Sequence, residues 1–187
     1  MSEGLALRAF SFGKGVYKKS KNAVLKISEI EAKVKNATNS ESWGPTGTIL
    51  NEIAIATTDV EEAATILHTL WERLREPPSN WRKVIKALVV LEYCIKNGTR
   101  RFLEDVRDNL DQIEACHRFQ SVDPDTMVDR GQAIRDKSQA LVGLLLDADR
   151  LAAERSKAAE VRGRLQHGGW GDEWDAGPRP GGRGDGR

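Results

Sequence analysis

The placement of the prolines constrains the fold of this 187-residue chain more than any other feature. All six prolines lie between segments in which apolar residues recur every three or four positions, and none lies inside such a segment. Apolar residues at this spacing form one face of a helix, and a proline inside a helix would break it. We therefore predict a series of helices that are separated at the prolines. No segment shows a convincing strand-like alternation.

Polar side chains at the predicted helix starts can cap free backbone N–H groups. Ser28 and Glu31 form a capping box, Asp59 begins a segment with the same spacing, and Ser79 and Thr99 precede two further helices. The predicted helices cover residues 12–26 (weakly), 28–38, 46–57, 60–76, 80–97, 100–110, 112–118, 129–146 and 148–166. Their short connections favour antiparallel neighbours. The predicted fold is all-α, a compact superhelix (solenoid) of about eight antiparallel helices plus an N-terminal amphipathic helix.

Three parts of the chain differ in composition. Residues 1–27 form a basic amphipathic segment, residues 28–166 contain the helical domain, and residues 167–187 form a tail. Eight of the twenty residues from 168 to 187 are glycine. Such a composition cannot bury enough apolar surface to fold, so we expect a flexible tail.

Composition excludes several classes of protein. The chain is 39% hydrophobic, but no apolar run approaches the length that spans a bilayer. The N-terminus shows no apolar region of the kind found in secretory signals. Two cysteines do not make a disulfide framework and fit a reducing compartment, so we expect a cytoplasmic protein.

The sequence offers no constellation for catalysis or metal binding. It has neither a glycine-rich phosphate loop nor a nucleophile elbow, and its three histidines fall on separate segments. Cys94 lies among apolar residues and is interpreted as a core residue. We therefore expect no enzyme activity, no catalytic residue, no metal site and no cofactor.

The basic residues are unevenly distributed, although the net charge is only +1. Residues 1–26 contain six basic residues and one acidic residue, and residues 72–101 contain eight basic and three acidic residues. This asymmetry favours an anionic partner, although charges on solvated helix faces are the simpler alternative. The sequence pI of about 7.8 and the few aromatic residues among the basic ones argue against nucleic acid.

Residues 12–27 place their apolar and basic side chains on opposite faces of a helix, with Leu25 as the exception. Such a helix suits a membrane interface, where lysines meet lipid phosphates. Gly13 and Gly15 disfavour the helix, and the sequence leaves open whether it is ordered without lipid. Permanent packing on the domain and binding to an acidic protein groove are the alternatives. The residues predicted to insert into the membrane are Phe12, Val16, Tyr17 and Val24.

A set of motifs carries a family resemblance through its order and spacing. The motifs are Ser28–Val34, Ala37–Asn39, Trp43–Pro45, Asn51–Ala54, Leu70–Leu74, Asn80–Leu88, Glu92–Thr99, Asp129–Lys137 and Asp147–Leu151. Over residues 15–165 the chain resembles the epsin N-terminal homology (ENTH) domain of clathrin-associated adaptors.

The resemblance implies a phosphoinositide-binding superhelix in clathrin-mediated vesicle formation. In this family an N-terminal helix folds around the inositol headgroup and wedges into the cytoplasmic leaflet. We accordingly expect a cytoplasmic, peripheral membrane protein, monomeric, at coated pits or vesicles of the plasma membrane or of the Golgi and endosomes. The alternative function is a protein-interaction module that binds a SNARE, or cargo or ubiquitin as the related VHS domains do.

The family's headgroup positions can be carried over to this sequence. They fall on Lys18, Lys21, Lys35, Arg73, Lys83 and Lys86. A polar position falls on Ser40, beside Asn39, whereas Ser79 stands where a lysine is usual. Ser20 replaces a large apolar residue of the inserting helix, so insertion is shallower or Phe10 and Phe12 compensate.

The five tryptophans are interpreted in two groups. Trp43, Trp71 and Trp81 are predicted to pack in the core and between helices. Trp170 and Trp174 lie among acidic residues in the tail and resemble short peptides that dock on clathrin or clathrin adaptors. The tail is therefore the predicted contact for those partners.

Overall fold

The helix α4 (Trp81–Asn97) is the centre of the fold and contacts helices on every side. Eight of its residues are buried, and Val84, Leu88 and Leu91 are fully enclosed. The computed structural model describes residues 29–167. The other elements are a helix at residues 29–37, α2 (Gly47–Ala56), α3 (Val60–Leu74), η1 (Pro78–Asn80), α5 (Arg100–Asp108), α6 (Leu110–Glu114), η2 (Ala115–Arg118), α7 (Gln132–Leu146) and α8 (Ala148–His167).

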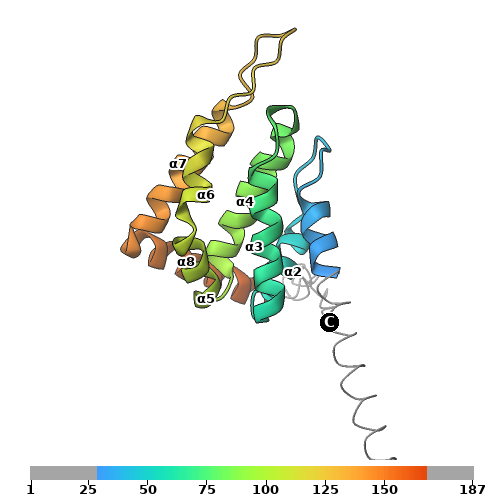
Figure 1. Cartoon of the computed structure of the whole chain (residues 1–187). Helices are drawn as coiled ribbons and strands as arrows, with labels where there is room; N and C mark the ends of the chain where they lie inside the picture. Colours follow the sequence, from blue (N-terminus) through green and yellow to red (C-terminus); the bar gives the residue numbers. More distant parts are fainter. Residues whose placement is uncertain (1–28, 168–187) are drawn as a thin grey trace, which may run out of the picture.

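Alternate connections lie at the same end of the molecule. Figure 1 shows the loop at 38–46, the turn between α3 and α4, and the loop at 119–131 at the upper end, and the turn between α4 and α5 at the lower end. The predicted all-α fold of antiparallel helices is confirmed. Within residues 29–167 the only β pairing is an isolated bridge between Val122 and Asp129. The helix predicted at 12–26 lies outside the described residues.

Of the four predicted caps two are confirmed and one is wrong, and the capping residue Ser28 lies outside the described residues. Asp59 accepts hydrogen bonds from the first-turn amides of α3, and Thr99 Oγ1 accepts one from Phe102 N at 3.2 Å. Ser79 does not cap α4, because Pro77 and Pro78 set up a 3₁₀ turn that includes it. The helix predicted from residue 129 begins at Gln132 instead.

The core confirms the buried role of Cys94 and corrects that of Trp43. Cys94 is fully buried, and Trp71 and Trp81 are partly buried and pack against the core. Trp43 is 65% exposed, so its prediction as a packing residue is wrong. It lies in the loop between the first described helix and α2 and is not among the residues that pack against the core.

Charged side chains attach α8 to α4. Arg155 and Arg162 of α8 donate to backbone carbonyls at the carboxyl end of α4, including that of Asn97 at 2.9 Å from Arg162 Nη1. Lys96 Nζ lies 3.0 Å from a carboxylate oxygen of Glu92 and also 3.0 Å from one of Glu154. Arginines at the carboxyl end of a helix donate to its free carbonyl groups and interact favourably with the negative end of the helix dipole. None of the described helices is long and apolar enough to cross a membrane.

Candidate functional site

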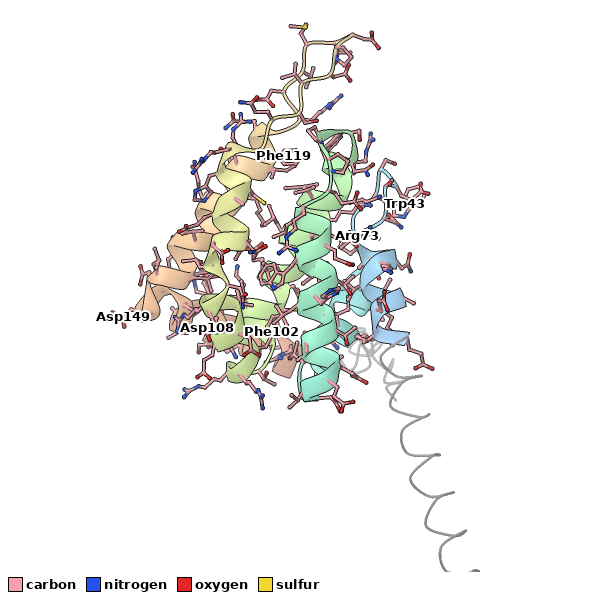
Figure 2. The ribbon with its side chains drawn as sticks, viewed as in Figure 1. Trp43, Arg73, Phe102, Asp108, Phe119 and Asp149 are labelled. Atoms are coloured by element: carbon pink, nitrogen blue, oxygen red, sulfur yellow. The ribbon has the colours of Figure 1, made fainter. Side chains whose placement is uncertain are left out.

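Three of the predicted headgroup residues lie at the upper end of α3 and α4. Arg73 is in the last turn of α3, Lys83 is in the first turn of α4, and Lys86 follows one turn later. Figure 2 shows Arg73 on the side of α3 that is nearest the loop carrying Trp43. The antiparallel turn between the two helices brings these cations together. The remaining predicted residues Lys18, Lys21, Phe12, Val16, Tyr17, Val24, Trp170 and Trp174 lie outside the described residues.

Arg73 and Lys83 share one carboxylate. Glu76 Oε1 accepts from Arg73 Nη1 at 2.8 Å and from Lys83 Nζ at 3.2 Å. Its other oxygen accepts from Asn80 Nδ2 at 2.7 Å, and Arg73 Nε donates to Thr38 Oγ1 at 3.1 Å. The side chains of the two cations and of Glu76 are each about a fifth exposed, at 18–21%. The cations are therefore held in place while solvent still reaches them.

The charge state of Glu76 follows from these contacts. The hydrogen bond from Asn80 lowers the pKa of the Glu76 carboxyl, those from Lys83 and Arg73 lower it further, and burial opposes them. The residue is thus a carboxylate at neutral pH. It neutralises part of the repulsion between Arg73 and Lys83.

Lys86 is buried beside the loop at 38–46. Lys86 as a whole is 7% exposed, and its ammonium donates to Asn39 Oδ1 at 2.7 Å. Burial lowers its pKa, and the negative charge of Glu41 opposes this shift. Lys86 and Asn39 line a cavity of about 140 Å³ together with Trp43 and Thr46. Since an ammonium carries three N–H bonds, Lys86 has donors to offer an anion that enters the cavity.

Lys35 is the one described candidate that stands apart from this group. Its ammonium is exposed and pairs with Glu31 at 2.6 Å, one turn back along the same helix. Ser40, the predicted polar position, is exposed, and the neighbouring Asn39 is the residue that contacts Lys86. The structure therefore brings together Arg73, Lys83 and Lys86, whereas the Lys35 ammonium pairs with Glu31 instead.

The group offers chemistry for an anion that carries more than one phosphate. Arg73 can form two parallel bonds with a phosphate, whereas Lys83 and Lys86 supply point charges. Asn80 adds a neutral donor, which is directed at Glu76, and Asn39 orients the Lys86 ammonium by accepting its hydrogen bond. Among the described residues no group of three or more histidine, cysteine or acidic side chains could hold a metal ion.

Sequence reasoning missed Glu76, Thr38 and Asn80. The residues Arg73, Glu76, Asn80 and Lys83 follow one another at the three- and four-residue spacing of neighbours on one helix face. Pro77 and Pro78 hide this signal, because they predict a break between the two helices. The chain reverses at the 3₁₀ turn η1, so that Arg73 of α3 and Lys83 of α4 both reach Glu76 in the turn between them.

The fold and the site together define a class: an α-helical superhelix with a cationic, partly open site for anions at one end. The family model described as the ENTH domain matches residues 27–151. A curated relative from Arabidopsis thaliana, named "Clathrin interactor EPSIN 2", is 39% identical over 166 residues, which cover 83% of this chain and 18% of the relative. This chain belongs to the ENTH domain family.

Solved structures agree with this assignment. The ENTH domain of human epsinR matches with a TM-score of 0.67 and 39% identity, over 71% of this chain and 97% of that one. The ENTH domain of epsin-2 in complex with phosphatidylinositol 4,5-bisphosphate matches with a TM-score of 0.65 and 32% identity, over 68% of this chain and 89% of that one. The resemblance that the sequence motifs indicated is confirmed.

Proposed function

We propose that this chain is a phosphoinositide-binding, non-enzymatic adaptor domain that acts in clathrin-mediated vesicle formation. The observation that carries the proposal is that Arg73, Lys83 and Lys86 lie together at one end of α3 and α4. A cavity lined by Lys86 and Asn39 opens beside them. A related domain was solved with a phosphatidylinositol bisphosphate, which supports this ligand class. The chain spans about a fifth of the length of the curated relative described above, so activities of whole epsins extend beyond what this domain explains.

In this proposal the lipid headgroup binds where the cations converge. Phosphates contact Arg73, Lys83 and Lys86, and Lys35 contributes from the edge of the site. Lys18 and Lys21 complete the site from the N-terminal segment. That segment folds into an amphipathic helix on the lipid and inserts Phe12, Val16, Tyr17 and Val24 into the cytoplasmic leaflet. The residues 28–166 act as the folded unit in this scheme.

The partners follow from the same scheme. The domain docks peripherally on a phosphoinositide-containing membrane of a coated pit or vesicle, at the plasma membrane or at the Golgi and endosomes. Trp170 and Trp174 of the tail bind clathrin or clathrin adaptors through their indoles, with the neighbouring acids as steering charges. A SNARE would be a protein partner of the helical surface. The domain works as a monomer.

A double substitution tests the site. Lys83→Glu with Lys86→Glu should abolish binding to phosphoinositide liposomes in a sedimentation assay and leave helical circular dichroism unchanged. Because Lys86 is buried, Lys83→Gln with Lys86→Gln provides a variant that introduces no buried carboxylate. The control Lys157→Glu with Arg164→Glu makes the same change of net charge on the exposed face of α8 and should retain binding. Equal binding by the Lys83 and Lys86 variants would reject the site.

Folding of the N-terminal segment is tested by adding liposomes or the soluble headgroup to the wild-type chain. We expect helical circular dichroism to rise as residues 12–26 order on the ligand. An unchanged spectrum at saturating ligand would remove coupled folding from the proposal.

A further inference from the structure

The most exposed tryptophan of the described residues lies at the rim of the candidate site. Trp43 is 65% exposed, although tryptophan is usually buried over most of its surface. It lines the same cavity as Lys86 and Asn39. Figure 2 shows its side chain pointing outward from the loop at 38–46, away from the helical body. The indole does not pack against the core, and it lies beside Lys86, one of the cations that would bind a headgroup.

The loop that carries Trp43 is fixed at both ends. Asn39 Oδ1 accepts from Glu41 N at 3.2 Å and from Lys86 Nζ at 2.7 Å, so one side chain ties the loop to α4. At the other end Thr46 Oγ1 accepts from Ile49 N and starts α2. The backbone that carries Trp43 is therefore tied to α4 at one end and to the start of α2 at the other.

The position of this loop indicates that the partner of the indole is a lipid bilayer. The loop and the turn between α3 and α4 lie at the same end of the molecule (Figure 1). A bilayer whose headgroup enters the site must therefore approach the loop as well. Indole rings favour the level of the lipid headgroups, where the ring meets apolar matter and its N–H meets water.

A second exposed apolar residue at this end suits an anionic bilayer less well. Met127 in the loop at 119–131 is 75% exposed, but the three aspartates close to it in the chain outnumber the two arginines that pair with them, Arg130 with Asp123 and Arg135 with Asp129. Carboxylates are repelled by a leaflet that contains anionic lipids. Near Trp43 the acidic residue Glu41 faces the charge of Lys86. The charges therefore favour the Trp43 loop as the membrane contact.

We propose that Trp43 is an interfacial membrane anchor, which inserts its indole among the lipid headgroups beside the phosphoinositide site. This inference rests on the proposed function, because it takes the membrane to lie against the candidate site. The anchor acts on the bilayer and not on the inositol ring. It adds affinity for a membrane without adding affinity for the free headgroup.

The test compares two ligands and two variants of the full chain. Trp43→Ala should weaken binding to liposomes containing phosphatidylinositol 4,5-bisphosphate by about tenfold, as expected for loss of a large apolar contact. Binding of soluble inositol 1,4,5-trisphosphate, measured by calorimetry, should stay within about twofold of wild type, a margin of about 0.4 kcal/mol. Ile55→Ala removes a comparably exposed apolar side chain, 59% exposed, from the end of α2 and should change neither affinity.

The possible results distinguish the membrane anchor from the proposed function on which it rests. Unchanged liposome binding by Trp43→Ala overturns the anchor, as does an equal loss with the soluble headgroup, which would place the indole against the ligand. Failure of the wild-type chain to bind either ligand would instead refute the proposed function. As a direct readout, brominated phospholipids should quench the fluorescence of wild type more than that of Trp43→Ala. Equal quenching would contradict insertion.

Discussion

Glu76 provides a sharp test of the candidate site, because its carboxylate would lie next to a phosphate bound by the same cations. It accepts from Arg73 at 2.8 Å and from Lys83 at 3.2 Å, the two cations that should bind the ligand. Glu76→Gln removes the negative charge and keeps the size of the side chain. We expect the variant to bind phosphoinositides more tightly than wild type.

The size of the gain follows from Coulomb's law. A phosphate that contacts the same two nitrogens must lie within about 5 Å of the carboxylate, as two acceptors on one donor group do. The repulsion between a carboxylate of charge −1 and a phosphate of charge −2 at this distance is about 1.7 kcal/mol at a dielectric constant of 80 and about 3.3 kcal/mol at 40. Physiological salt roughly halves these values. The remaining 1–2 kcal/mol, approximately, corresponds to about five- to thirtyfold in Kd.

Stability should change in the opposite direction. Glu76→Gln loses charge-assisted hydrogen bonds from Arg73 and Lys83, which we expect to cost about 1 kcal/mol. For a domain of this size that lowers Tm by about 2–4 °C. The affinity is measured by calorimetry with soluble inositol trisphosphate and the Tm by circular dichroism. Glu72→Gln removes the same charge from an exposed position on α3 and should change the affinity less than about twofold.

The reasoning fails if Glu76→Gln binds more weakly than wild type while remaining folded. That result would mean that the carboxylate holds Arg73 and Lys83 in the binding geometry, and that this support outweighs its repulsion of the phosphate.

Three further predictions concern the helical body. Gly98→Ala should destabilise the fold by about 1–3 kcal/mol in urea unfolding, because its Cβ would lie 2.6 Å from the carbonyl oxygen of Cys94; wild-type stability would contradict this contact. Burial raises the pKa of the Cys94 thiol to about 12 and that of Cys116 to about 11, so neither should react with a disulfide reagent at pH 7.5 until the chain unfolds. Burial raises the pKa of Glu92, but hydrogen bonds led by Lys137 outweigh it and leave the pKa below 4.5. The folded state then binds fewer protons than the unfolded state, so stability should fall as the pH falls below about 4.5, and Glu92→Gln should flatten that dependence in acid unfolding curves.

The periodicity of the apolar residues and the prolines predicted most of the fold. Asp59 and Thr99 marked helix starts correctly, because a cap depends only on a side chain and the backbone next to it. Ser79 failed because Pro77 and Pro78 place it inside a 3₁₀ turn, and part of the support for that turn comes from a distant part of the chain. The 3₁₀ turn at Pro78–Asn80 is held partly by a hydrogen bond from Ser121, 43 positions away, to the carbonyl of Pro78.

The candidate site was predicted in part. Arg73, Lys83 and Lys86 could be named because the family resemblance carries positions along the chain. The partners that hold them could not, since Thr38 reaches Arg73 from 35 positions away and Asn39 reaches Lys86 from 47. Trp43 was placed in the core because tryptophans usually pack there, but side-chain type alone does not say which loop faces solvent.

The central claim is that the cations at the upper end of α3 and α4 bind the phosphates of a lipid headgroup. Side-chain NMR during a titration with soluble inositol trisphosphate tests it most directly. The Nε–H signal of Arg73 and the ammonium signals of Lys83 and Lys86 should shift together with one Kd, while the Nε–H of Arg155 and of Arg162 on α8 stay in place. Shifts confined to α8, or no shift of Arg73 at saturation, would contradict the account.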